Sequence, residues 1–146
     1  MPDAFEDVTI ARLGAQGDGV AETAKGAQFV PFALPGETWR MGLDGATPQR
    51  LTSSPSRIAP ICQHFGTCGG CMSQHMAPDL YAEWKRGVVV QAFAHRGIEA
   101  QVMPLTAIAP RSRRRAFLGI EYTGKTVTIG FREEGQHTLV DMAECP

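Results

Sequence analysis

The chain has 146 residues, a formal net charge of −1 and 43% hydrophobic residues, as expected for one globular domain or two small ones. The near-zero net charge excludes binding of nucleic acid through overall basicity. No apolar run reaches the length of a membrane span, and the acidic residues 1–7 lack the apolar segment of a secretory signal. The sequence therefore predicts a cytoplasmic protein that does not contact a membrane.

Short runs of strand character, separated by turn residues, make up the first part of the chain. The polar–apolar alternation and the β-branched and aromatic residues predict strands over residues 7–13, 19–22, 27–32 and 38–43. The glycines of residues 14–19 resemble a dinucleotide-binding loop, but no amphipathic helix follows them, so a hairpin turn is predicted instead. Many short strands at close spacing predict a small barrel over residues 1–56, of the OB type that binds oligonucleotides.

One helix and a small sheet are predicted for the second part, residues 57–146. The helix starts at Pro78, which suits a first turn, and ends before Gly97, which suits the position after a helix end. Apolar side chains recur at every fourth position along one of its faces. Further strands are expected over residues 99–105, 114–122, 125–132 and 138–141. The predicted fold class is therefore mainly β with one helix (α+β).

Four cysteines form a candidate metal site, with three in one glycine-rich loop and one near the C-terminus: Cys62, Cys68, Cys71 and Cys145. Thiolates select iron–sulfur clusters, zinc or Cu(I). Disulfide frameworks are typical of short, cysteine-dense secreted domains and do not fit this chain. Zinc sites of four cysteines usually offer two short Cys-x-x-Cys pairs, whereas this chain offers one. The spacing therefore favours a [4Fe–4S] cluster, with zinc as the open alternative.

Basic and aromatic residues of the second part are candidate RNA contacts: Arg113, Arg114, Arg115, Phe131, Arg132 and His137. Arginine forks match phosphate oxygens, and Phe131 could stack on an unpaired base. Each residue also has a structural interpretation. The arginines could be a solvated strand end, Phe131 could be buried in the sheet, and Arg132 and His137 could be polar hairpin residues.

The cysteine loop and its surroundings, residues 62–75, resemble the cluster signature of the RNA (uracil-C5)-methyltransferase family, bacterial enzymes that methylate uridines of 23S ribosomal RNA. Residues 8–37 resemble the TRAM domain of that family, an OB-like RNA-binding barrel. Residues 129–141 and Cys145 resemble its Gly-Phe-Arg hairpin, its Val-Asp strand and its fourth cluster ligand. The resemblance implies a [4Fe–4S] cluster on the four cysteines, in a small domain closed onto that cluster, and ribosomal RNA as the partner.

The family continues after the fourth cysteine into a Rossmann-type domain that binds S-adenosylmethionine and carries a catalytic cysteine and a carboxylate base. This chain ends at Pro146, and its four cysteines are all assigned to the metal. We therefore expect no catalytic residue here and no methylation without a catalytic domain, in a longer parent chain or a separate one. The alternatives are a standalone RNA-binding module stabilised by zinc or a cluster, and an iron–sulfur electron carrier. The sequence does not indicate an oligomeric state.

Overall fold

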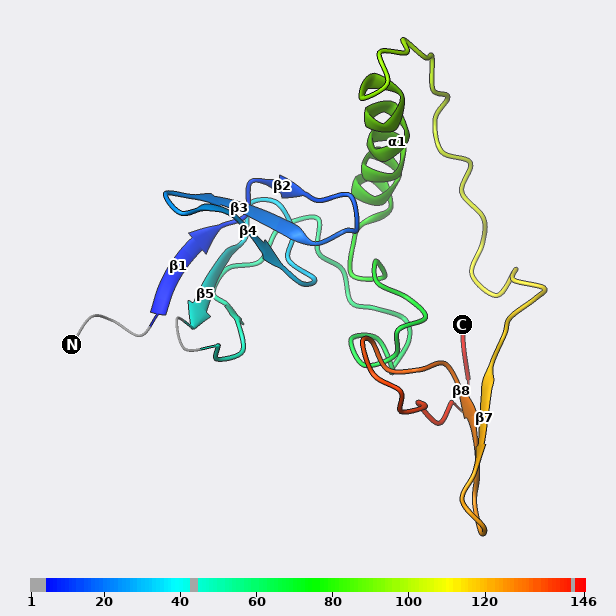
Figure 1. The fold of residues 1–146 in the computed structure, drawn as a ribbon. Helices are drawn as coiled ribbons and strands as arrows, with labels where there is room; N and C mark the ends of the chain where they lie inside the picture. The colour runs from blue at the N-terminus through cyan, green and yellow to red at the C-terminus, as the bar shows by residue number, and fades with distance from the viewer. Residues whose placement is uncertain (1–4, 43–44, 143) are drawn as a thin grey trace. The chain divides into compact units, whose positions relative to one another are not determined.

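The computed structural model describes residues 5–42, 45–142 and 144–146, which are mainly β with one helix, as predicted (Figure 1). Contacts divide the chain into two compact units. The first unit comprises residues 1–58 and 76–105, and the second comprises residues 59–75 and 106–146. The helix groups with the N-terminal strands, whereas the sequence analysis placed it with the cysteine loop. The domain assignment 1–56 and 57–146 stays a prediction.

The strands of the first unit form two antiparallel sheets of three strands each. One sheet has the order β1-β5-β6, and the other has the order β2-β3-β4. These strands are β1 (Phe5–Thr9), β2 (Arg12–Leu13), β3 (Gly19–Thr23), β4 (Gly26–Val30), β5 (Thr38–Gly42) and β6 (Gln49–Arg50). The strands predicted over residues 19–22, 27–32 and 38–43 correspond to β3, β4 and β5, with residue 43 outside the described residues. The single strand predicted over residues 7–13 is instead divided between β1 and β2, which belong to different sheets. Closure into an OB barrel stays a prediction.

The core of the first unit is formed by side chains at every second position of an extended segment, because successive side chains point to opposite faces. Val8 and Ile10 are two residues apart, so both side chains face inward, and both are buried. They pack with Ala21, Val30 and Ala33.

The hairpin predicted for the glycines of residues 14–19 is confirmed, because β2 pairs with β3 across this loop. The amide of Gly14 donates to the carbonyl oxygen of Asp18 at 2.7 Å. At Gly19 a Cβ atom would lie 2.7 Å from the Cβ of Ala33, so only glycine fits this position.

A buried carboxylate joins the loops of the first unit. Glu37 has no exposed surface. Its oxygens accept hydrogen bonds from Arg57 Nε (2.5 Å) and Nη2 (2.8 Å), from Trp39 Nε1 (2.9 Å), and from the amides of Leu34 (2.9 Å) and Ser54 (3.2 Å). Burial by itself raises the pKa of Glu37, but these hydrogen bonds, with that from Arg57 the strongest, outweigh burial and lower the pKa to about 2. Glu37 is therefore an anion in the folded protein.

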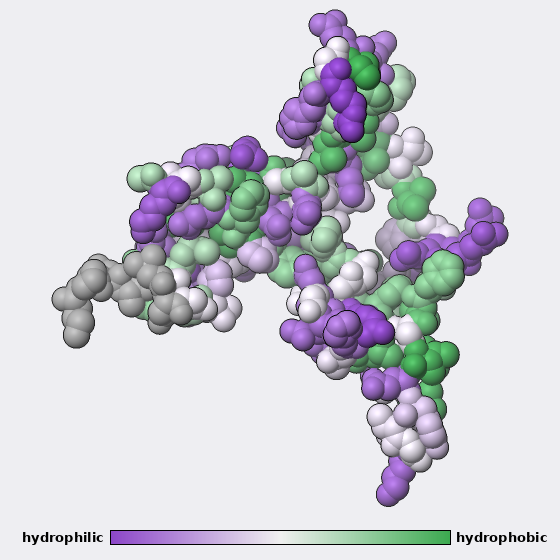
Figure 2. Space-filling model, viewed as in Figure 1, coloured by the Kyte–Doolittle hydropathy of each residue, from purple (hydrophilic) through white to green (hydrophobic). Residues whose placement is uncertain are grey.

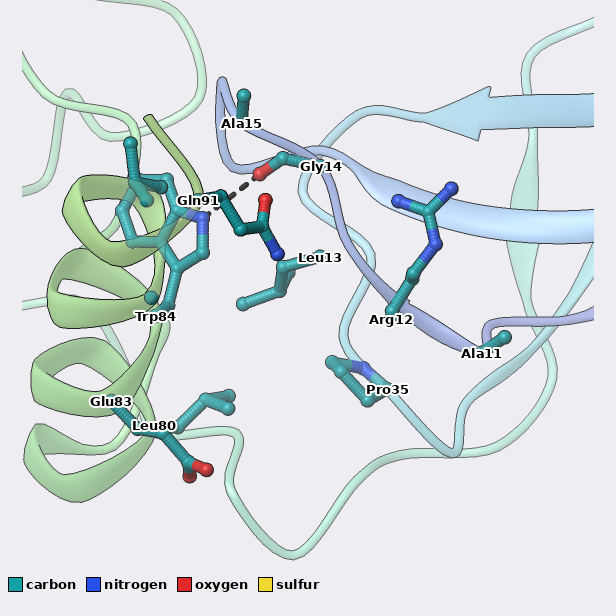
Figure 3. Close-up of a pocket in the computed structure, with 12 residues that line it drawn as sticks. Ala11, Arg12, Leu13, Gly14, Ala15, Pro35, Leu80, Glu83, Trp84 and Gln91 are labelled. Carbon is teal, nitrogen blue, oxygen red and sulfur yellow. Dashed lines mark hydrogen bonds between the residues drawn. The ribbon is translucent and has the colours of Figure 1, made fainter. Parts of the chain in front are cut away.

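The helix α1 (Pro78–Ala94) packs on the β2–β3 hairpin loop of the same unit. The indole Nε1 of Trp84 donates to the carbonyl oxygen of Gly14 at 2.8 Å, the bond drawn in Figure 3. A cavity of about 390 Å³ lies beside this contact, lined by Leu80 and Glu83 of α1 and by Leu13 of β2 (Figure 3). The predicted helix end is confirmed: Gly97 has φ +68° and its amide donates to the carbonyl oxygen of Ala94 at 2.9 Å.

The second unit contains a two-stranded antiparallel hairpin of β7 (Gly119–Tyr122) and β8 (Val127–Gly130). The turn predicted at residues 122–125 joins them. Apolar side chains stay exposed on this hairpin (Figure 2). Ile120, for example, is 72% exposed. Among the described residues, no helix has the length and apolar character needed to cross a membrane.

Three strand predictions were wrong in whole or in part. Residues 99–105 form no strand, residues 114–118 form none before β7, and residues 138–141 contribute one isolated bridge, between Leu139 and Arg132. Alternating polarity shows that a segment suits a sheet face, but a strand also needs a hydrogen-bonding partner. Within the described residues, 99–105 and 114–118 have no partner strand, whereas residues 138–142 bond to residues 129–133 without forming a continuous strand.

Candidate metal centre

Tight turns build the cysteine loop. The amide of Phe65 donates to the carbonyl oxygen of Cys62 at 3.2 Å, and the amide of Cys68 donates to that of His64 at 2.9 Å. The side chain of Gln74 accepts from the amide of Cys62 at 3.1 Å. These bonds hold Cys62 and Cys68 within one compact loop, which residue spacing alone does not ensure.

The residues after β8 pair with this loop. The amide of Gly69 donates to the carbonyl oxygen of Arg132 at 2.9 Å, and the amide of Glu134 donates to that of Thr67 at 3.1 Å. Cys68 and Glu133 form the bridge between these bonds, and Cys68 is buried. The backbone ladder therefore fixes the Cys68 end of the loop on the residues that follow β8.

The C-terminal segment lies on the other side of the same residues. The amide of Val140 donates to the carbonyl oxygen of Phe131 at 2.9 Å, and the amide of Met142 donates to that of Ile129 at 3.2 Å. A Cβ atom at Gly130 would collide with the carbonyl oxygen of Val140, so glycine permits this close approach. The chain thus returns toward the loop three residues before Cys145.

The three loop cysteines influence the fourth thiol electrostatically. Burial raises the pKa of the Cys145 thiol, and the charges of Cys71, Cys62 and Cys68 raise it further. None of the four forms a disulfide; Cys62 is half-buried, whereas Cys71 and Cys145 are exposed. Over residues 5–42, 45–142 and 144–146, no group of three or more His, Cys, Asp or Glu side chains is arranged to hold a metal ion.

The chemistry of this donor set fits a soft metal. Four thiols from one loop and one distant segment are ligands that iron–sulfur clusters and zinc accept. The Nε2 atom of His64, between Cys62 and Cys68, is buried without a hydrogen-bond partner in the part of the chain that the structure describes. Buried polar atoms normally have a partner, and a metal-bound thiolate beside this loop would accept a hydrogen bond from His64. The assignment of the four cysteines as ligands stays a prediction.

The candidate RNA contacts occupy the second unit and stay predictions. Arg114 and Arg115 are exposed. Arg132 Nη1 donates to the carbonyl oxygen of His137 at 2.6 Å, so these two residues contact each other across the turn that follows β8. This contact agrees with the interpretation of Arg132 and His137 as polar hairpin residues. Both side chains are exposed to solvent.

The structure adds one contact that the sequence analysis missed. The guanidinium carbon of Arg113 lies 5.9 Å from the centre of the Phe131 ring, a cation–π distance. The same ring lies against Gly70 of the cysteine loop. No sequence pattern joins residues 70, 113 and 131, because their proximity depends on the pairing of three segments that are distant in the chain.

Substitution of Gly130 by alanine is expected to weaken the second unit without removing a thiol. The added Cβ atom forces the carbonyl of Val140 away, which costs about 2–3 kcal/mol of unfolding free energy through overpacking. We expect a lower midpoint in denaturant unfolding and faster loss of bound metal to a chelator. Val127→Ala, at an exposed position of the same strand, is the control and should leave both nearly unchanged; an unaltered Gly130→Ala protein would contradict the observed pairing.

Comparison with known proteins identifies relatives over nearly all of the chain. No protein-family model matches it. An uncharacterized RNA methyltransferase of Caulobacter vibrioides is 44% identical over 148 residues, which cover 97% of this chain and 36% of that protein. One of Brucella suis is 43% identical, with 95% of this chain and 34% of that protein covered.

A third relative has a more specific name. The 23S rRNA (uracil(1939)-C(5))-methyltransferase RlmD of Photorhabdus laumondii is 40% identical over 152 residues, which cover 95% of this chain and 34% of that protein. The chain spans about a third of the length of the curated relatives it matches. The resemblance noted in the sequence is thereby confirmed: the chain is homologous, over nearly its whole length, to about a third of proteins named RNA methyltransferases.

Proposed function

We propose that the chain is the RNA-binding, metal-containing N-terminal part of an S-adenosylmethionine-dependent RNA (uracil-C5)-methyltransferase that acts on ribosomal RNA in the cytoplasm. The observation that carries the proposal is the backbone pairing of the cysteine loop with the residues after β8, which also pair with the segment that leads to Cys145. The 40% identity to an enzyme named for uracil-C5 methylation of 23S rRNA supports the reaction class. The site for S-adenosylmethionine and the catalytic cysteine would lie in a separate catalytic domain.

The proposed cofactor is a [4Fe–4S] cluster held by Cys62, Cys68, Cys71 and Cys145. When bound, it would join the cysteine loop to the C-terminal segment through metal–sulfur bonds. Methyl transfer to uracil after thiolate addition moves no net electron, so a structural role suffices for this chemistry. The free energy of metal binding would then stabilise the fold of the second unit and the surface around residues 111–115.

The first test of this function is metal analysis of protein purified without oxygen. We expect a brown protein with broad visible absorption, about four irons per chain and an equal amount of sulfide, as an all-cysteine cubane requires. A colourless protein with one zinc per chain would show that the centre holds zinc instead of a cluster. It would favour the alternative of an RNA-binding module. A protein that binds neither metal under reducing conditions would refute the proposed centre.

RNA binding is tested by reversing single charges in the exposed arginine run. Arg114→Glu and Arg115→Glu are each expected to weaken binding of a ribosomal RNA fragment about tenfold, because each removes a phosphate contact and adds repulsion. The slope of log affinity against log salt should fall by about 1 for each. Lys125→Glu makes the same charge change in the turn between β7 and β8, and equal losses in all three variants would show only a net-charge effect.

A further inference from the structure

Arg113 has a defined position beside the cysteine loop. Its guanidinium carbon lies 5.9 Å from the centre of the Phe131 ring, and its Nε donates to the carbonyl oxygen of Arg115 at 3.1 Å. The planar guanidinium on an aromatic face is a favourable arrangement that limits the freedom of a long side chain. Arg113 and Arg114 are both exposed, but among the described residues this stacking is present for Arg113 and not for Arg114.

The ring that carries Arg113 lies on the segment between two cysteines. A Cβ atom at Gly70 would lie 2.9 Å from Cδ2 of Phe131, so the ring contacts the loop backbone directly. The amide of the same glycine approaches Sγ of Cys68 at 3.4 Å. Gly70 therefore contacts the Phe131 ring and also donates to a thiol, so the ring links Arg113 to the segment from Cys68 to Cys71.

The neighbouring charges distinguish Arg113 from Arg111. In the described residues, no carboxylate forms an ion pair with Arg113, whereas its neighbour Arg111 is paired with Glu144. The positive charge of Arg113 is thus available to the thiols.

We propose that Arg113, held on the ring of Phe131, is the counter-charge of the four-cysteine centre and is not an RNA contact. Four thiolates around either Zn²⁺ or a [4Fe–4S]²⁺ core carry a net charge of about −2, so the same compensation serves both metals. A fixed cation nearby stabilises this excess charge and slows the loss of metal. The inference rests on the metal centre proposed above, and it assigns Arg113 a positioning and electrostatic role toward that centre.

The test compares Arg113→Gln with Arg114→Gln in the metal-loaded chain. Arg113→Gln is expected to release metal to a chelator about tenfold faster. Loss of a residue that supports the ligands without binding the metal typically weakens metal binding about 10- to 100-fold. Visible absorbance or a zinc indicator follows the release. Arg114→Gln should keep the wild-type release rate and lose RNA affinity, whereas Arg113→Gln should keep its RNA affinity. Arg113→Lys should fall between, because it retains the charge and loses the planar stack.

The outcomes separate this inference from the proposed function. If the wild-type chain holds metal and Arg113→Gln releases it at the wild-type rate, the counter-charge role is wrong and the metal centre stands. If Arg113→Gln weakens RNA binding as Arg114→Gln does, Arg113 is an RNA contact after all. If the wild-type chain binds no metal, both the centre and its counter-charge are refuted. A tenfold effect that shrinks at high salt supports the inference, since salt screens an exposed charge.

Discussion

Replacement of Glu37 by glutamine is expected to destabilise the first unit by about 3–5 kcal/mol. The carboxylate is fully buried, and it binds the guanidinium of Arg57, whose side chain is 14% exposed. Removal of one partner of a buried ion pair leaves the other charge without compensation in a poorly solvated place. Glutamine also replaces one acceptor oxygen by a donor NH₂ group, which would face the donors that now bind Glu37.

Denaturant unfolding followed by tryptophan fluorescence measures this effect, because Trp39 Nε1 donates to the Glu37 carboxylate at 2.9 Å. Asp7→Asn is the matched control. Asp7 also binds an arginine, Arg40, but both side chains of that pair are 43% exposed. Exposed pairs contribute little, so the control should unfold almost as the wild type does. Equal losses in the two variants would show that burial of the Glu37 network does not matter.

The same network predicts acid sensitivity. The pKa of Glu37 is about 2 in the folded protein and near the ordinary value of 4.5 in the unfolded chain. A lowered folded-state pKa contributes stability that is fully present above pH 4.5 and is lost as the pH falls toward 2. The contribution at neutral pH is roughly 3 kcal/mol. Glu37→Gln should flatten the decline of unfolding free energy between these pH values, and an unchanged acid profile would falsify the assignment.

Substitution of Cys68 by serine is expected to abolish stable metal binding and to unfold the second unit. Cys68 is the buried cysteine of the four, and its backbone pairs with Glu133. Ligand loss removes a metal–sulfur bond, and in small metal domains the binding free energy is folding free energy, about 10 kcal/mol or more for structural zinc. Serine keeps the size of the side chain approximately and loses the soft donor, so the change isolates ligation.

Metal content per chain and thermal unfolding with and without a chelator measure this effect. Gln63→Ser, in the same loop, is the control, because Gln63 is exposed. We expect the control to keep its metal and its unfolding temperature, and the Cys68→Ser protein to resemble the chelator-treated wild type. A Cys68→Ser protein that holds a full complement of metal would remove Cys68 from the ligand set.

The sequence by itself determined the features that depend on a few neighbouring residues. Alternating polarity located most strands of the first unit, the glycine-rich turn was identified as a hairpin, and Gly97 marked the helix end. Turn chemistry and periodicity act over a few residues, so they are readable without a fold. The four cysteines and the family resemblance were also evident from local motifs, and the relatives confirm the family.

Only the tertiary structure decided which distant segments meet. It placed Trp84 of the helix on the carbonyl of Gly14, and it joined Glu37 to Arg57. It also left residues 99–105 without a partner strand. Local pattern states which segments can pair or pack, but the choice of partner depends on the competition of all segments for contacts and hydrogen bonds. Arg113 shows the consequence: it was predicted as one of a run of RNA-binding arginines, and only the position of Phe131 and Gly70 indicates a different role.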